Sequence, residues 1–138
     1  MKEILTIPYS AFNDWYQLQK FLELRGNPSY ELVGDVDLLR QKGIVNLGNL
    51  VRIDGNLNIF ASSVQSLETL EYVGGYLILR NTPIKSLGNL KYVRDELDLR
   101  DTLIQSLGKL EYVGGIVTLS QYSEIPKEEL IKFKFCYW

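Results

Sequence analysis

The stretch "SLGNLKYVRDELDLRDTLIQ", Ser86–Gln105, decides the fold because it is one copy of a repeated unit. It is preceded by "SLETLEYVGGYLILRNTPIK" at 66–85 and followed by "SLGKLEYVGGIVTLSQYSEI" at 106–125. A fixed period near 20 residues is typical of a solenoid, in which each unit forms one coil and buries its apolar side chains against the next. The repetition therefore predicts the architecture before any single residue is considered.

Aliphatic residues recur at fixed positions of the unit. They form four columns: Leu50, Leu70, Leu90 and Leu110; Ile53, Val73, Val93 and Val113; Leu57, Leu77, Leu97 and Val117; Ile59, Leu79, Leu99 and Leu119. The last two columns are two residues apart, which places both on the same side of a β-strand. Stacked coils are therefore expected to form a parallel sheet from "DVDLL", "NLNIF", "YLILR", "ELDLR" and "IVTLS", with these columns inside. A degenerate first copy begins near Tyr30.

Small residues mark two turns in each coil. The hydroxyls of Ser62, Thr82 and Thr102 fall in a buried turn, where a short polar side chain can satisfy backbone groups. Glycine marks a corner before the strand, where we expect a positive φ. The corner sequences are Asp54-Gly55, Gly74-Gly75 and Gly114-Gly115.

The two flanks differ from the repeat and are expected to close its open ends. Residues 1–28 should form a cap with a short strand in "KEILTIP" and a helix from an N-cap at Ser10 to about Arg25. Residues 126–138 should form a second cap, with a short helix after Pro126 and a closing strand in "KFKFCYW". Both caps belong to one domain, because an exposed strand edge would otherwise invite pairing with another chain.

The unit "L-x-x-V-x-G-x-L-x-L-x-x-T-x-I-x-S-L-G-x" resembles the short leucine-rich-repeat-like solenoid proteins of bacteria and bacteriophages. The resemblance covers 30–125 and is close over 46–122, and Tyr122 departs from it by replacing threonine. It implies a mainly β protein with capping helices, in which 29–125 form a right-handed solenoid of about five coils with a parallel sheet. It also implies a protein-recognition scaffold that uses the exposed strand face, without catalytic residues.

Composition excludes several classes of function. The formal net charge is −2 and no window is strongly basic, so we expect no nucleic-acid binding. No apolar run is long enough to cross a membrane, and the first ten residues lack the pattern of a secretory signal. Cys136 is the single cysteine, which excludes an intrachain disulfide and favours a reducing, cytoplasmic location.

The chain has no histidine, which removes histidine-based acid–base catalysis, the usual activation of serine or cysteine nucleophiles, and most zinc sites. Cys136 has no basic partner of known position and is interpreted as a packing residue. We therefore expect no enzyme activity, no cofactor and no metal site.

Side chains that alternate with the inward leucines should face solvent. These positions vary between copies: Asp35, Asp37 and Leu39; Asn56, Asn58 and Phe60; Tyr76, Ile78 and Arg80; Glu96, Asp98 and Arg100; Ile116, Thr118 and Ser120. Apolar and aromatic side chains beside arginine on an exposed sheet often mark a contact site. We predict that the partner-binding residues are Phe60, Tyr76, Ile78, Arg80, Glu96, Asp98, Arg100 and Ile116.

The leading hypothesis is a non-enzymatic module that presents this strand face to a protein partner. Analogy with the family suggests a phage- or bacteria-encoded inhibitor of a host protein. A carbohydrate-binding or carbohydrate-active solenoid is the first alternative, using Asp98 and the tyrosines Tyr72, Tyr92 and Tyr112, although packing of each ring on the next is the favoured interpretation of that ladder. Self-assembly into a homo-oligomer is the second alternative.

Overall fold

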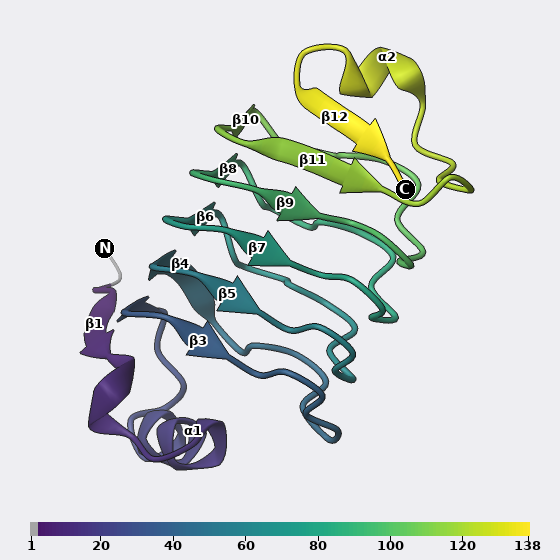
Figure 1. Ribbon diagram of the computed structural model, residues 1–138. Helices are drawn as coiled ribbons and strands as arrows, with labels where there is room; N and C mark the ends of the chain where they lie inside the picture. Colours follow the sequence, from purple (N-terminus) through teal and green to yellow (C-terminus); the bar gives the residue numbers. More distant parts are fainter. Residues whose placement is uncertain (1–2) are drawn as a thin grey trace.

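The computed structural model describes residues 3–138, which form a β-solenoid of about five turns with a cap at each end (Figure 1). Successive coils lie directly on one another, so the chain advances along the stack from the N-terminal to the C-terminal cap. This arrangement confirms the stacked coils, parallel pairing and mainly β class that the repeat predicted.

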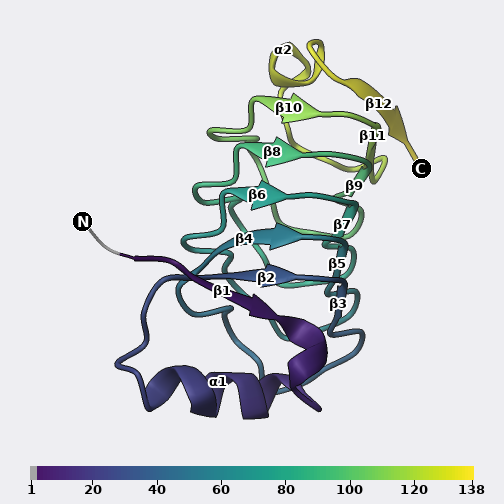
Figure 2. The ribbon, with the colours of Figure 1, turned by 90° about the vertical axis from the view of Figure 1, so that its left-hand side faces the viewer.

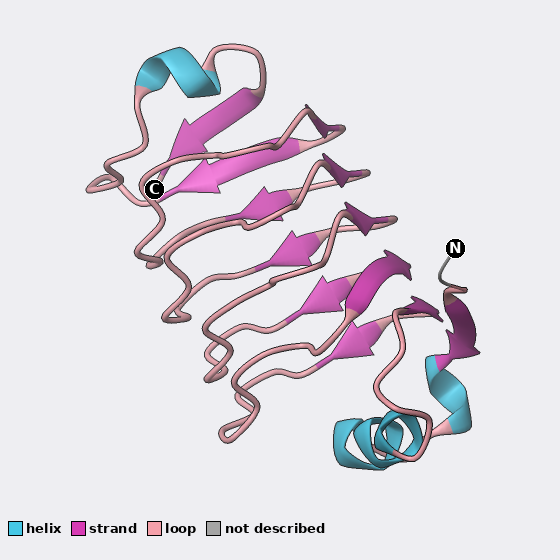
Figure 3. Cartoon of the chain, turned by 180° about the vertical axis from the view of Figure 1, so that it is seen from behind, coloured by secondary structure: helices cyan, strands magenta, loops and turns pink. Residues whose placement is uncertain are grey.

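Two parallel sheets run along the stack, and Figure 2 shows their strands in two columns. Sheet A contains, in spatial order, β1 (Leu5–Pro8), β2 (Tyr30–Val33), β4 (Leu50–Asp54), β6 (Tyr72–Val73), β8 (Tyr92–Val93) and β10 (Tyr112–Val113). Sheet B contains β3 (Val36–Asp37), β5 (Leu57–Asn58), β7 (Leu77–Ile78), β9 (Leu97–Asp98), β11 (Ile116–Leu119) and β12 (Lys134–Tyr137). The remaining side of each coil consists of turns and loops (Figure 3).

Sheet B is the sheet that the sequence predicted, whereas sheet A was not expected. In three coils a Tyr-Val pair forms a two-residue strand of sheet A, with tyrosine outside and valine inside, as at Tyr72 and Val73. A strand this short leaves no measurable alternation in the sequence, because a period of two needs several residues to be recognised.

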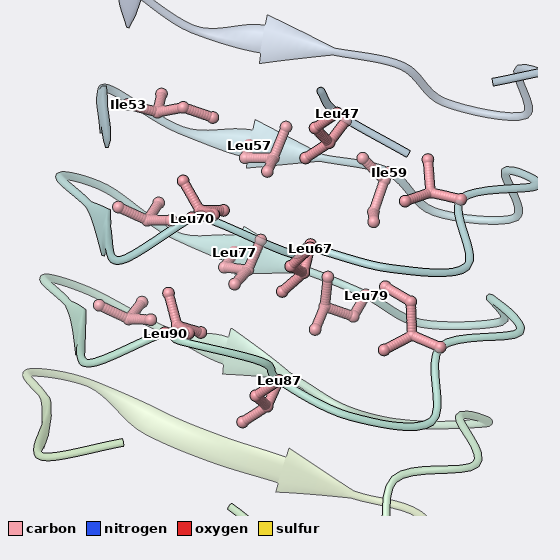
Figure 4. Close-up of a cluster of buried hydrophobic side chains, with 14 of the residues drawn as sticks. Leu47, Ile53, Leu57, Ile59, Leu67, Leu70, Leu77, Leu79, Leu87 and Leu90 are labelled. Atoms are coloured by element: carbon pink, nitrogen blue, oxygen red, sulfur yellow. The ribbon is translucent and has the colours of Figure 1, made fainter. Parts of the chain in front are cut away.

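Apart from Val113, the aliphatic columns are buried between the two sheets and the turns (Figure 4). Leu57, Leu77 and Leu97 occupy successive rungs of sheet B and are completely buried. Burying such a side chain contributes about 1.5–3 kcal/mol to folding. The rungs repeat along the stack, so every coil supplies part of the core of the next.

The hydroxyl prediction for the buried turn is confirmed. Thr82 Oγ1 donates to the carbonyl of Leu79 at 2.6 Å, and Thr102 Oγ1 donates to that of Leu99 at 2.8 Å. In the equivalent turn, the Ser62 hydroxyl accepts from the amide of Val64. These short side chains satisfy backbone groups that water cannot reach.

The conformational prediction for the corner glycines is wrong. Positive φ angles occur elsewhere in the coil, for example at Gly88 with 57° and Asn81 with 58°, and not at Gly55 or Gly75. The corner requires glycine at position 55 for lack of space, because a Cβ atom there would lie 2.6 Å from the carbonyl carbon of Gly34 in the preceding coil.

The N-terminal cap contains a 3-10 turn, Tyr9–Ala11, and helix α1 (Trp15–Glu23). The predicted N-cap at Ser10 is wrong: Ser10 lies in the 3-10 turn, and Asp14 caps α1 by accepting from the amide of Gln17 at 2.8 Å. Trp15, Leu18 and Leu22 of α1 are buried beneath the first coil.

Tyr30 fixes this cap to the first coil. Its hydroxyl donates to the carbonyl of Leu47 at 2.6 Å and accepts from Nε2 of Gln19 at 3.1 Å.

We expect Tyr30→Phe to lower the free energy of unfolding by about 1–2 kcal/mol, because the Leu47 carbonyl would lose its buried donor. Urea denaturation checks this, with the exposed Tyr16→Phe as the control that should leave stability unchanged.

The pH dependence of the stability follows from the burial of the same Tyr30 hydroxyl. Burial raises the pKa of Tyr30 above its ordinary value, so its contribution to stability is complete below about pH 10 and falls as the unfolded chain ionises above it. Tyr30→Phe should therefore make the alkaline loss of stability smaller, and an unchanged profile would contradict this assignment.

The C-terminal cap combines helix α2 (Lys127–Leu130) with the closing strand β12. Oε1 of Glu129 accepts from the Ser106 hydroxyl and from the Leu107 amide, both at 2.9 Å, which fixes α2 to the last coil. Strand β12 pairs in parallel with β11, as the alternating sequence predicted. Both elements predicted for this cap are therefore present.

Candidate functional site

The outer face of sheet B carries three rows of side chains that cross the coils. The strand registers define the middle row as Asp37, Asn58, Ile78, Asp98, Thr118 and Cys136. One flanking row contains Asn56, Tyr76, Glu96, Ile116 and Lys134, and the other contains Phe60, Arg80, Arg100, Ser120 and Trp138. The structure thus brings all eight predicted contact residues together on one face.

Aromatic rings flank the two arginines of the second row. The guanidinium carbon of Arg80 lies 5.6 Å from the centroid of Phe60, and that of Arg100 lies 5.6 Å from the centroid of Trp138. Both separations fall within the range of cation–π attraction. The row therefore presents an aromatic ring, two guanidinium groups, the hydroxyl of Ser120 and a second aromatic ring in that order, and Trp138 is 69% exposed.

Asp98 holds Arg100 in a bidentate ion pair. Nε of Arg100 lies 2.9 Å from Oδ1 and Nη2 lies 2.7 Å from Oδ2, and the hydrogen bond to Asp98 raises the pKa of Arg100. Arg80 makes a longer contact of 3.7 Å with Asp101. The planar Arg100 fork is oriented before a partner arrives, which reduces the conformational entropy lost on binding.

The row containing Tyr76 supplies the apolar part of the face. Tyr76 and Ile116 are 36% and 44% exposed, and Glu96 lies between them along the row. The amide of Tyr76 donates to Oδ1 of Asn56 at 2.8 Å, so the tyrosine backbone is fixed by the neighbouring coil. Ile78 is half-buried beside them in the middle row.

The middle row also has a structural role that the sequence did not reveal. Asp37, Asn58 and Asp98 each accept a hydrogen bond from the amide two residues later, at 3.0, 3.0 and 3.1 Å. These side chains stabilise the end of each strand. Ile78 and Thr118 break the pattern, so the middle row varies less freely than its sequence suggested.

The tyrosine ladder lies on the other sheet. The rings of Tyr72 and Tyr92 stack at 4.6 Å, those of Tyr92 and Tyr112 stack at 4.7 Å, and the Arg52 guanidinium lies 3.6 Å from the centroid of Tyr72. Ring-on-ring packing, the favoured interpretation, is confirmed. Asp98 belongs to sheet B, so the structure does not bring the ladder and Asp98 into one site.

A hollow of about 590 Å³ opens on the turn side of the last coils and reaches Ser120 at the margin of the outer face of sheet B. Leu103, Tyr122, Asp101 and Glu124 are among the residues that line it. Leu103 and Tyr122 are exposed, and the hollow includes none of the eight predicted contact residues. Its carboxylates are those of Asp101 and Glu124, and the Asp101 carboxylate accepts a hydrogen bond from the Ser120 hydroxyl at 3.2 Å.

Sequence reasoning missed Trp138, although the signal was present. "KFKFCYW" was recognised as a closing strand, but its register on β11 was needed to place Trp138 beside Arg100. Arg52 was missed for a similar reason, since the unexpected strand β4 aligns it with Tyr72.

Within residues 3–138, no cluster of three or more cysteine, aspartate or glutamate side chains could hold a metal ion. No helix in the described part of the chain is long and apolar enough to span a membrane. Comparisons with protein-family models, curated proteins and solved structures find no match to this chain. The geometry of its surfaces is therefore the basis for a functional proposal.

Proposed function

We propose that this protein is a non-enzymatic binding module that docks a protein partner on the outer face of sheet B. The observation that carries the proposal is the grouping of exposed Tyr76, Ile116 and Trp138 with Arg80 and Arg100 on a single face. Tyrosine, tryptophan and arginine are the residues that contribute most often to the energetic centre of protein interfaces.

The scaffold favours binding without rearrangement. Main-chain hydrogen bonds join each strand of sheet B to its neighbours, and the core beneath is completely buried at Leu77 and Leu97. A partner would therefore meet a rigid surface, and little free energy would be spent on ordering this side of the interface. Two arginines beside aromatic rings suit a partner surface that offers carboxylates within an apolar patch.

The proposal for the biological role rests on analogy with the family that the repeat resembles. The repeat resembles leucine-rich-repeat-like solenoids of bacteria and bacteriophages, so we propose a cytoplasmic accessory protein that occludes a host protein. Occlusion needs only a stable contact surface and no reactive group, which agrees with the absence of histidine from the sequence.

A paired substitution tests the face. We expect Tyr76→Ala/Arg80→Glu to reduce recovery of the specific partner at least about tenfold in affinity capture with quantitative mass spectrometry, because two central contacts are lost and one charge is reversed. Gln65→Ala/Lys85→Glu makes the same change of charge on the turn side and should retain the partner. Equal recovery of one partner by all three proteins would exclude this face.

Light scattering on the same proteins tests self-assembly. If the face instead joins two copies of this chain, the wild type would have the mass of a dimer or larger species, and the double variant would have the mass of one chain. A single-chain mass for the wild type at tens of micromolar is the result that the proposal expects.

A further inference from the structure

The sequence Glu-Tyr-Val-Gly-Gly occurs twice, at 71–75 and at 111–115. In both places tyrosine and valine form a strand of sheet A, β6 in the first copy and β10 in the second. The first copy is covered by β8 of the next coil, whereas β10 is the last strand of sheet A (Figure 2). The same chemical surface is therefore occupied in one place and open in the other.

The occupied copy shows what this surface binds. Lys91 Nζ lies 3.3 Å from Oε1 of Glu71, and the rings of Tyr92 and Tyr72 stack with an interplanar angle of 7°. Val93 pairs with Val73 on the inner side of the sheet. The surface thus accepts a basic, an aromatic and an aliphatic residue in succession.

Main-chain hydrogen bonds hold this segment in parallel register. The amides of Lys91 and Tyr92 both donate to the carbonyl of Glu71, at 2.9 and 3.2 Å. The amide of Arg94 donates to the carbonyl of Val73 at 3.0 Å. The amide of Asp95 donates to the carbonyl of Gly75 at 3.1 Å. Three carbonyl oxygens therefore face the added strand.

The second copy is more exposed at every residue. Tyr112 is 48% exposed and Glu111 is exposed, whereas their counterparts Tyr72 and Glu71 are half-buried; Val113 is half-buried, whereas Val73 is completely buried. The closing strand β12 joins sheet B and leaves this edge of sheet A without a neighbour (Figure 1).

The backbone and side chains of this edge lack the partners that the first copy has. The carbonyls of Glu111, Val113 and Gly115 accept no hydrogen bond from any residue between 3 and 138. Within the same range, the Glu111 carboxylate forms no ion pair, and only one face of the Tyr112 ring is stacked on another tyrosine. The three free carbonyl oxygens, the Glu111 carboxylate and the open face of the Tyr112 ring are all directed to the position that a further strand would occupy.

We propose that the β10 edge, defined as residues 111–115, is a second binding site that takes an extended segment of a partner protein as an additional parallel strand. The segment has a basic residue, an aromatic residue and an aliphatic residue in that order. The basic side chain pairs with Glu111, the aromatic ring stacks on Tyr112, and its amides donate to the three open carbonyls. Strand addition of this kind takes affinity from the main chain and specificity from alternate side chains.

The probe is the peptide LKYVRD, the sequence of residues 90–95, with blocked ends. In an NMR titration of the whole protein, we expect saturable shifts of backbone signals at 111–115. Tyr112→Ala should weaken binding at least about fivefold, because it removes the stacking partner. Circular dichroism should show that this exposed substitution leaves the fold intact.

Two comparisons make the test specific for the β10 edge: one uses two methylated peptides, and the other exchanges the charges of the ion pair. Methylating the peptide amide at arginine removes the donor to the Val113 carbonyl and should abolish binding, whereas methylating the valine amide, which does not face this edge, should be tolerated. Glu111→Lys should weaken LKYVRD about twofold to fivefold, and the peptide LEYVRD should bind that variant better than it binds the wild type.

Saturable shifts confined to another region, such as the opposite edge strand β1, would overturn the proposal, as would equal binding by both methylated peptides. The variant Tyr76→Ala/Arg80→Glu should bind LKYVRD as the wild type does, so failure of the outer face of sheet B as a docking surface is distinguished from failure of the β10 edge.

Discussion

Leu77→Ala is expected to lower the free energy of unfolding by about 3 kcal/mol, within the range of about 2–5 kcal/mol for removing a buried leucine side chain. Leu77 is completely buried in the middle of the stack, in register with Leu57 on one side and Leu97 on the other. Both neighbours are held by their own strands and cannot move far to fill the space. Part of the cost is therefore a cavity that two coils share.

Urea denaturation followed by circular dichroism measures this loss, and the midpoint should move without a change of slope. The matched control is Leu103→Ala, because Leu103 is 57% exposed in a turn and its truncation removes little buried contact. A loss at Leu77 that is no larger than the loss at Leu103 would show that the rungs of sheet B are not the core.

Gly55→Ala is expected to lower the free energy of unfolding by about 2–3 kcal/mol, because the added methyl group overpacks two coils at their closest approach. The new Cβ atom would lie 2.6 Å from the carbonyl carbon of Gly34 and 3.0 Å from Oδ1 of Asp35. Backbone atoms cannot turn away as a long side chain can, so the coils would have to separate locally.

The direction of the stability change in Gly55→Ala distinguishes overpacking of the coils from the opposite effect, in which alanine stabilises the protein by restricting the unfolded chain. Gly55 does not have a positive φ, so alanine suits its backbone conformation and would ordinarily stabilise by about 0.4–1 kcal/mol through the unfolded chain. Thermal unfolding of the variant therefore settles the question. A raised melting temperature would contradict the close approach of the coils at this corner.

Much of the fold could be predicted because repetition amplifies weak signals. One Leu-x-Leu step is ambiguous, but the same step at 57–59, 77–79, 97–99 and 117–119 indicates stacked strands with one buried face. The caps were predicted from the departure of the flanks from the repeat and from capping residues, and the N-cap was misplaced, because both Ser10 and Asp14 suit that position.

Sheet A was not predicted because its repeated strands are two residues long, and two of them, β6 and β10, lead directly into glycine pairs that resemble a simple corner. Its stacked tyrosines were recognised as a ladder, but the Arg52 contact at one end and the open Tyr112 ring at the other depend on strand register. Register across coils of unequal length, as in the first copy, cannot be counted from the sequence alone.

The candidate site, too, was predicted only in part from the sequence. The outward direction of Tyr76, Arg80 and Arg100 follows from the inward leucines by the period of two. The ion pair between Asp98 and Arg100 and the placement of Trp138 beside it required coordinates, because side-chain rotamers and the docking of a unique closing strand are not repeated.

A photocrosslinking experiment tests the central functional claim most directly. A benzophenone amino acid replaces Tyr76 on the outer face of sheet B or Gln65 on the turn side, and each protein is illuminated in the cells that encode it. The account predicts one discrete crosslinked protein from position 76 and none from position 65. A crosslink from position 65 with none from position 76 would contradict it.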